Sequence, residues 1–245
     1  MLQEILKTER HAGVVRLTLR RPERGNSLSP DLVDMLAEQV RISYQDGTRL
    51  LVLEAEGKHF CTGFDLSDLD AVTDDILLAR FARIELLLQA LHAAPFTVAA
   101  IGHGRIMGAG ADLFLACEQR WIKGDASFCF PGAAFGLVLG TRRLASIVGT
   151  ARARAWVRSG SLISEAQAHE AGMFTDRVDH AEIDIRIEQL AAESSRLSLN
   201  THAAVQRATR STADELNADL CALLKSAAEP GLKSRIEAYR QASRK

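Results

Sequence analysis

The sequence lacks the features that mark several broad classes of protein. Its 245 residues carry 30 Lys and Arg against 31 Asp and Glu, a formal net charge of −1. This balance, with no basic cluster, argues against a protein that binds nucleic acid through the phosphate backbone. No run approaches the roughly 18 apolar residues of a transmembrane helix, and the N-terminal segment has no apolar stretch typical of a signal peptide. We therefore expect a cytoplasmic protein without a nucleic-acid or membrane partner.

Cysteine and histidine are too scattered to predict a metal or redox site. The four cysteines, Cys61, Cys117, Cys129 and Cys221, include no CxxC pair. The seven histidines show no metal-ligand spacing with one another or with cysteine. We expect reduced thiols and no bound metal.

Several catalytic motifs are also missing. The chain contains no GxSxG, HExxH or P-loop. The segment Gly102–Gly108 reads GxGxxxG, one residue too long for a dinucleotide fingerprint, and no acidic residue follows at the expected distance. The sequence therefore does not predict a nicotinamide cofactor.

What is present is typical of an ordinary globular protein. Residues are 47% hydrophobic and 25% charged, and the length suits one large domain, or one domain with a short appendage. Strands are predicted at 14–19, 50–53, 97–101 and 121–123, and helices from residue 29, over 74–91 and over 108–117. From Arg142 onward the pattern is almost entirely helical. This order predicts an α/β layer followed by a helical tail.

The first predicted helix has a clear start and a clear apolar face. Ser29 and Pro30 are typical of an N-cap followed by the first helical position. Apolar residues then recur at helical spacing, so we expect one buried face that comprises Leu32, Met35, Leu36 and Val40.

Two turns rich in small residues each follow a predicted strand. They span 57–66 and 102–112. Backbone N–H groups are unpaired where a helix begins, and the helix dipole favours negative charge there. Two such turns at neighbouring strands could aim two N–H groups at one point and form an oxyanion hole. Alternatively, the glycines only permit tight packing, and spacing alone does not decide between these interpretations.

The segments that contain these turns resemble a known family. In order, the chain contains RRPERGNSLS, LLVLEAEGKHFCTGFDL, AAIGHGRIMGAGADLFLACEQRWI, SLISEAQAHEAGMFTDRV and KSAAEPGLKSRIEAYRQ. These resemble the motifs of the enoyl-CoA hydratase/isomerase (crotonase) superfamily over nearly the whole length. The resemblance implies an α/β fold of the ClpP/crotonase-like type. It places a core of ββα superhelical repeats in residues 1–190 and a C-terminal helical trimerisation region in 191–245.

The resemblance also implies an acyl-CoA thioester as substrate, with coenzyme A as part of the substrate and no further cofactor. The backbone N–H groups of Phe64 and Ala109 would stabilise the enolate-like oxygen. Phe64, Asp65, Leu66 and Ser67 would line the thioester, as would Ala109. Arg24 and Lys58 are candidates for the nucleotide phosphates, although a solvated surface role is open for either cation.

The pattern of catalytic carboxylates is incomplete. In hydratases of this family, one carboxylate lies three residues beyond the second oxyanion residue, and here that position is Asp112. A structural role for Asp112, as the partner of an Arg or as a charge at a helix N-terminus, is equally open. The second carboxylate position is Gly132. His103 stands where the family often has Asn, and we favour a turn-stabilising hydrogen bond over catalysis for it.

Paired acid–base hydration therefore lacks one partner. We expect an acyl-CoA lyase or isomerase that is not an efficient hydratase and that forms a homotrimer or a dimer of trimers. The alternative is a non-catalytic member that binds CoA thioesters or assembles with other subunits. A protease of the ClpP-type fold would need a nucleophilic Ser and a His that the sequence does not place.

Overall fold

The computed structural model describes residues 4–242, so the extreme ends of the predicted core and tail, 1–3 and 243–245, lie outside it. Within that range the strands form one seven-stranded sheet of order β1-β2-β3-β4-β5-β6, with β7 paired to β5. The strands β2, β3, β4 and β5 are parallel neighbours. The strand bounds are β1 (Leu6–His11), β2 (Val14–Leu19), β3 (Leu50–Ala55), β4 (Thr97–Met107), β5 (Gln119–Cys129), β6 (Ile163–Ser164) and β7 (Asp176–Arg177).

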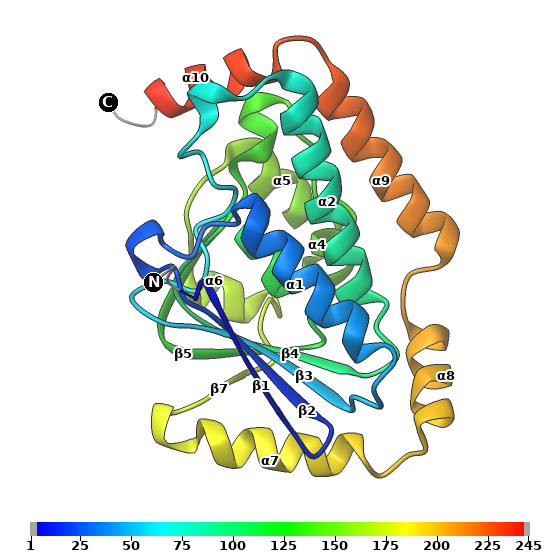
Figure 1. Cartoon of the computed structure of the whole chain (residues 1–245). Coiled ribbons are helices and arrows are strands. Elements are labelled where there is room, and N and C mark those ends of the chain that lie inside the picture. Colours follow the sequence, from blue (N-terminus) through cyan, green and yellow to red (C-terminus); the bar gives the residue numbers. More distant parts are fainter. Residues whose placement is uncertain (1–3, 243–245) are drawn as a thin grey trace.

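Helices cover both faces of this sheet (Figure 1). Successive residues of a strand point to opposite faces, so Leu51 and Leu53 of β3 join the core under α1 and α2, whereas Leu50 and Val52 pack with α7. The predicted α/β layer is therefore confirmed. The helix bounds are α1 (Pro30–Ser43), α2 (Asp74–His92), α3 (Ala109–Leu115), α4 (Thr141–Val148), α5 (Thr150–Ser159), α6 (Glu165–Glu170), α7 (Ile183–Ser194), α8 (Leu199–Thr209), α9 (Ala213–Ala228) and α10 (Leu232–Ala242).

Strand β1 was not expected from the sequence. Its residues LKTERH are mostly polar, and only Leu6 is buried. It is an edge strand that pairs antiparallel with β2, and an edge strand needs an apolar residue only where it faces the core. Hydrophobic periodicity therefore carries little signal for it.

The predicted glycine-rich turn at 102–108 is wrong. That segment is mostly the second half of β4, which continues to Met107 through an irregularity between Gly102 and Gly104. A Cβ at Gly104 would lie 2.0 Å from the Lys58 carbonyl oxygen. The glycine thus permits the close approach of the loop after β3, and α3 begins only at Ala109.

The start of α1 is as predicted, but its buried face is not entirely so. The Ser29 side chain accepts a hydrogen bond from the Leu32 amide, with Pro30 in the first turn. The buried residues include Val33, whereas Met35 is 38% exposed. Val33, Leu36 and Val40 share one face at i, i+3 and i+7, which leaves Met35 at its margin.

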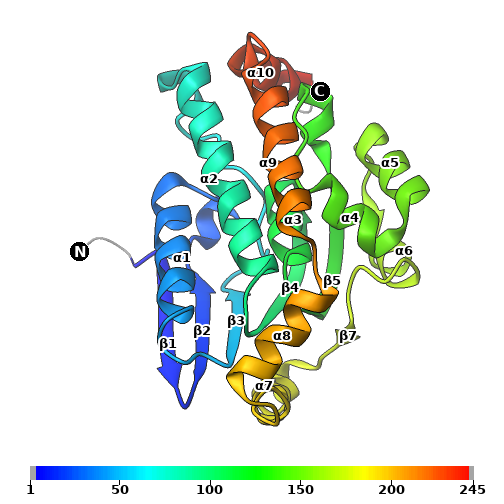
Figure 2. The same ribbon diagram turned by 90° about the vertical axis from the view of Figure 1, so that its right-hand side faces the viewer.

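The helical tail folds back onto its own chain. Helix α9 runs alongside α2, and α10 crosses near the N-terminal end of α2 (Figures 1 and 2). The Asp74 carboxylate accepts hydrogen bonds from the amides of Gly231, Leu232 and Lys233. A second apolar cluster joins the two regions through Leu69, Val72, Leu77, Phe81, Leu137, Leu223, Ala227, Leu232 and Ile236.

The predicted domain boundary at 190/191 falls inside the continuous helix α7. Trimerisation through the region beyond it stays a prediction. Across residues 4–242, no helix is both long and apolar enough to cross a membrane.

Candidate active site

The two small-residue turns meet at one cavity of about 280 Å³. The Met107 amide donates a hydrogen bond to the Cys61 carbonyl, which joins the turns. A Cβ at Gly63 would lie 2.8 Å from the Met107 oxygen, and one at Gly110 would lie 2.4 Å from the Cys61 oxygen. Tight packing is therefore one reason for the glycines. The turns contribute to the lining Thr62, Gly63, Phe64, Met107, Gly108 and Ala109.

The amides of Phe64 and Ala109 are free donors at this cavity. The segment around Phe64 pairs with Leu28 through Gly63 and Asp65, so the N–H of Phe64 points away from Leu28. Ala109 is the first residue of α3, where an N–H has no acceptor within the helix. Within residues 4–242, neither amide donates a hydrogen bond. The geometry is compatible with the predicted oxyanion hole, whose occupation stays a prediction.

Asp112 lies one helical turn beyond Ala109 and lines the same cavity. Its side chain is almost fully enclosed, and the residue is 4% exposed. Its Oδ1 atom has no hydrogen-bond partner, and Gly140 packs so closely that a Cβ there would lie 1.9 Å from Oδ1. Burial raises the pKa of Asp112 to about 8; the Arg143 charge opposes this shift and the Glu85 charge reinforces it. At neutral pH the carboxyl group is therefore mostly protonated.

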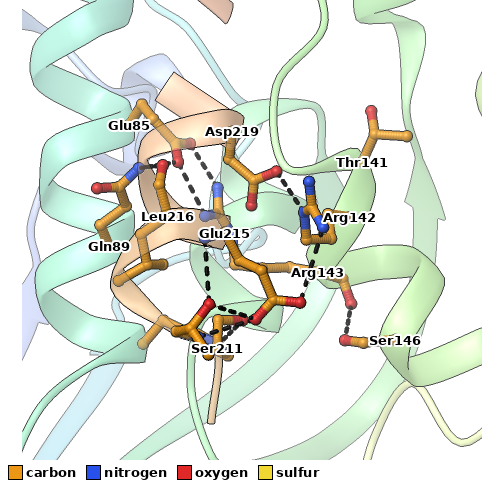
Figure 3. Close-up of polar contacts among 12 residues, drawn as sticks. Glu85, Gln89, Thr141, Arg142, Arg143, Ser146, Ser211, Glu215, Leu216 and Asp219 are labelled. Carbon is orange, nitrogen blue, oxygen red and sulfur yellow. Dashed lines mark hydrogen bonds and ion pairs between the residues drawn. The ribbon is translucent and has the colours of Figure 1, made fainter. Parts of the chain in front are cut away.

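The two charges that act on Asp112 form an ion pair with each other. This pair lies at the junction of α2, α4 and α9 (Figure 3). Arg143 donates from Nη1 and Nη2 to the two carboxylate oxygens of Glu85, at 2.9 and 2.5 Å. The two side chains are 2% and 1% exposed. Gln89 donates to Glu85 Oε1 and to the Leu216 carbonyl, which ties α9 to the pair.

The sequence analysis missed Glu85 and Arg143, although α2 carries a signal. Glu85 follows Phe81 by four residues and precedes Leu88 by three, so it occupies the buried face of an amphipathic helix. A charged residue at such a position needs a buried partner. The sequence does not identify that partner, because Arg143 is 58 residues away.

The short helix η3 (Pro131–Phe135), which contains Gly132, also lines the cavity. Among the described lining residues, Asp112 carries the only carboxyl group, and neither serine nor histidine is present. The serine and the histidine that the protease alternative would need are therefore absent from the described lining. The other ionisable groups are the Cys129 thiol, whose pKa is raised by burial and which donates to the Gly160 carbonyl, and the Tyr239 hydroxyl.

The remainder of the cavity is apolar and aromatic. Phe64 stacks on Phe81 with ring centroids 4.3 Å apart, and Phe135 lies 5.4 Å from Tyr239 of α10. The tail helix therefore closes the cavity with residues of its own chain. The other large apolar lining residues are Leu66, Phe130, Leu137, Leu139, Val157 and Ile236.

The residues expected at the nucleotide lie outside the cavity. Arg24 and Lys58 are exposed on two loops that Asn26 joins, since its amide donates to the carbonyls of Glu56 and His59. Neither cation forms an ion pair within the described chain. Both therefore stay available as predicted phosphate ligands.

The other predicted binding residues take different places. Asp65 accepts hydrogen bonds from Arg21 (2.7 Å) and from the Ser67 amide (2.9 Å), so its carboxylate stabilises the first turn. Leu66 lines the cavity, whereas Ser67 is exposed outside it. His103 donates from Nε2 to the Gly57 carbonyl (3.0 Å), which confirms the turn-stabilising interpretation.

Comparisons with known proteins agree with this architecture. Residues 9–233 match the family model for enoyl-CoA hydratase/isomerase. The probable enoyl-CoA hydratase echA6 of Mycobacterium bovis is 33% identical over 205 residues, 80% of this chain and 82% of that protein. The 1,2-epoxyphenylacetyl-CoA isomerase of Escherichia coli is 32% identical, over 78% of this chain and 76% of that protein.

Solved structures show the same fold. A Bordetella parapertussis protein described as an enoyl-CoA hydratase/isomerase superposes with a TM-score of 0.93 at 39% identity, over 96% of this chain and 98% of that chain. An enoyl-CoA hydratase of Bacillus halodurans, 20% identical, superposes with a TM-score of 0.83 over 96% of this chain and 100% of that chain. The crotonase fold expected from the sequence motifs is confirmed.

Proposed function

Because the chain belongs to the enoyl-CoA hydratase/isomerase family, we propose that it binds an acyl-CoA thioester in this cavity and transforms it through an enolate. The thioester oxygen lies between the amides of Phe64 and Ala109, both unpaired and both at the cavity. Two fixed N–H donors stabilise the charge that develops on this oxygen more than they stabilise the neutral ground state.

The chemistry that fits best is that of an isomerase or lyase. The observation that carries this proposal is that Asp112 has the only carboxyl group on the described lining, to which Gly132 also belongs. In a double-bond shift, one carbon loses a proton and another carbon of the same substrate gains one. A single group can accept that proton and return it, whereas hydration needs one group to activate water and another to protonate carbon.

The environment of Asp112 suits such a proton carrier. With a pKa of about 8, its anion is a stronger base than an ordinary carboxylate, and about a tenth of the population is ionised at pH 7. Enclosure in an apolar cavity excludes water from the enolate. This favours return of the proton to carbon over side reactions with solvent.

The acyl group is proposed to be apolar and of medium size. A cavity of about 280 Å³ is nearly twice the engineered cavity of about 150 Å³ that binds benzene. Its aromatic and aliphatic lining offers few polar partners to a charged or strongly polar acyl group. The similarity to a phenylacetyl-type CoA isomerase supports an aromatic ring or a short alkyl chain.

A non-catalytic acyl-CoA binder is the second candidate. It is favoured by the same glycine at 132 and by the absence of a hydrogen-bond partner that would orient Asp112 Oδ1. In this case the cavity would hold the thioester without turnover.

One experiment separates the two candidates. The purified protein is incubated with a panel of saturated and unsaturated acyl-CoA thioesters, products are followed by mass spectrometry, and affinities are measured by calorimetry. Conversion of at least one unsaturated thioester to an isomer or cleavage product is expected. Tight binding without conversion supports the binder, and no binding at all contradicts both.

We also propose assembly into a homotrimer or a dimer of trimers. Exposed large apolar side chains gather in and beside α7 and α8, at Ile185, Leu197, Leu199 and Val205. A concentration of exposed apolar side chains in one segment supports contact between subunits there. Light scattering after size exclusion should give a mass of three or six chains, and a monomer would contradict this assignment.

A further inference from the structure

Two neighbouring buried atoms lack hydrogen-bond partners although they are chemically complementary. Asp112 Oδ1 is an acceptor without a donor, and Arg143 Nε is a donor without an acceptor. Their helices α3 and α4 pack against each other, and Gly140, just before α4, touches the Asp112 carboxyl group. Both terminal nitrogens of Arg143 are held by Glu85.

The groups that face Asp112 come from several elements. Arg143 approaches from α4 and Glu85 from α2, and both act on the Asp112 charge. Across the cavity lie the Cys129 thiol and the Tyr239 hydroxyl. Glu85 and Arg143 cancel each other's charge, so a neutral Asp112 leaves no net charge buried behind the cavity.

We infer that the Glu85–Arg143 pair is the electrostatic partner of Asp112: its two opposite charges set how readily the Asp112 carboxyl group gives up its proton, and Arg143 supports the anion when the proton is on the substrate. The catalytic consequence rests on the proposed function, whereas the electrostatic arrangement does not. Both residues are positioning residues, because they act through Asp112 and do not line the cavity.

In this arrangement Glu85 and Arg143 shift the pKa of Asp112 in opposite directions. Without Glu85, the carboxyl groups that still act on the Arg143 charge are Asp112 and, more weakly, Asp219. The Asp112 carboxylate is then stabilised as an ion. Without Arg143, a buried Glu85 carboxylate is left near Asp112, and like charge makes Asp112 hold its proton more tightly. Opposite shifts show that both charges act on Asp112, and the rate of the double variant then tests whether they matter for turnover.

The test is a titration of Asp112 that needs no turnover. Carbon-13 NMR of carboxyl-labelled aspartate follows the Asp112 midpoint in the ligand-free protein, with the signal assigned by its loss in Asp112→Asn. Glu85→Gln is expected to lower the midpoint, and Arg143→Met to raise it, each by on the order of one pH unit. Shifts in the same direction, or none, would overturn the inference.

A matched control lies at the adjacent position. Arg142 pairs with Asp219 of α9 at 2.8 Å, but its side chain is 45% exposed and does not act on Asp112 (Figure 3). Arg142→Met removes the same charge one residue away and should leave the midpoint unchanged. A shift as large as that of Arg143→Met would mean that net charge, and not the pair, is responsible.

Removal of one buried partner can prevent folding, because the other charge is left uncompensated. The double variant Glu85→Gln/Arg143→Met removes both charges and should fold. Its Asp112 midpoint should lie between those of the single variants, while kcat falls at least tenfold with KM little changed. Wild-type kcat in this variant would overturn the inference. If the protein converts no acyl-CoA, the proposed function fails separately and the titrations still decide the electrostatic claim.

Discussion

Two segments that line the cavity, α3 and η3, differ in the ionisable groups that they contribute. The α3 wall carries a buried carboxyl group, Asp112, with a buried ion pair behind it. The η3 segment contributes Gly132 and Phe135 to the same lining and has no carboxylate. This difference supports the proposed function with one proton carrier, because hydration needs two acid–base groups.

The space for an added side-chain atom also differs between Gly132 of η3 and Gly140 beside Asp112. A Cβ at Gly132 would lie 3.4 Å from the Leu137 carbonyl, an ordinary contact, and Gly132 has no left-handed backbone. By contrast, Gly140 already presses on the Asp112 carboxyl group. The backbone at 132 therefore accepts a side chain, although the residue there is glycine. A longer acid at 112, by contrast, would have to displace its neighbours.

Removal of the proton carrier should have the largest effect. Asp112→Asn keeps the shape of the side chain and abolishes proton transfer, so kcat should fall by roughly 10²–10⁴-fold. Affinity for the thioester, measured by calorimetry, should change much less. An unaltered rate would mean that Asp112 does not transfer the proton, and it would favour the non-catalytic binder.

Loss of one oxyanion donor should have the next largest effect. Proline is tolerated in the first turn of a helix, so Ala109→Pro removes an N–H with little cost to α3 and should lower kcat on the order of 10²-fold. Ala109→Gly, which keeps the N–H, is the matched control and should stay within a few-fold of wild type. Full turnover in a folded proline variant would refute the oxyanion assignment.

Installing the missing carboxylate should sharpen the comparison. The wild-type protein is expected to hydrate crotonyl-CoA poorly, and Gly132→Glu should increase this rate by up to roughly 10²-fold, since a second acid–base group becomes available. The assay follows loss of the conjugated thioester absorbance, with Gly132→Ala as the control. Wild-type hydration at the rate of the glutamate variant would show that another acid already acts on the η3 wall.

The buried carboxyl group of Asp112 should also make the free energy of unfolding depend on pH. The pKa of Asp112 in the folded protein, about 8, lies above its ordinary value of 3.8. The contribution of this raised pKa to the free energy of unfolding is therefore complete below about pH 4 and is lost as the pH rises through 8. Between these limits it lowers stability by up to about 1.4 kcal/mol per pH unit. Denaturant unfolding should show a flatter pH dependence for Asp112→Asn than for wild type. Parallel curves would mean that Asp112 is ionised in the folded protein.

Short-range patterns were sufficient for much of the fold and for part of the site. The N-cap at Ser29, the strand at 14–19 and the turn at 57–66 depend on residues close in sequence, and each was found where expected. Most of the predicted turn at 102–112 is instead the second half of β4. The position of Asp112 beside Ala109 follows from one helical turn. In contrast, polar strand β1 and the extended β4 depend on pairing partners elsewhere in the sheet.

The sequence by itself determined the α/β order, the family motifs, the turn at 57–66, the acid at 112 and the glycine at 132. Only the tertiary structure decided that Asp112 is enclosed, that Glu85 of α2 pairs with Arg143 of α4 behind it, and that α10 closes the cavity. Helix starts, turns and periodicity arise from neighbours along the chain. Burial, pKa and the pairing of charges arise from groups that folding brings together across many residues, and no local pattern records them.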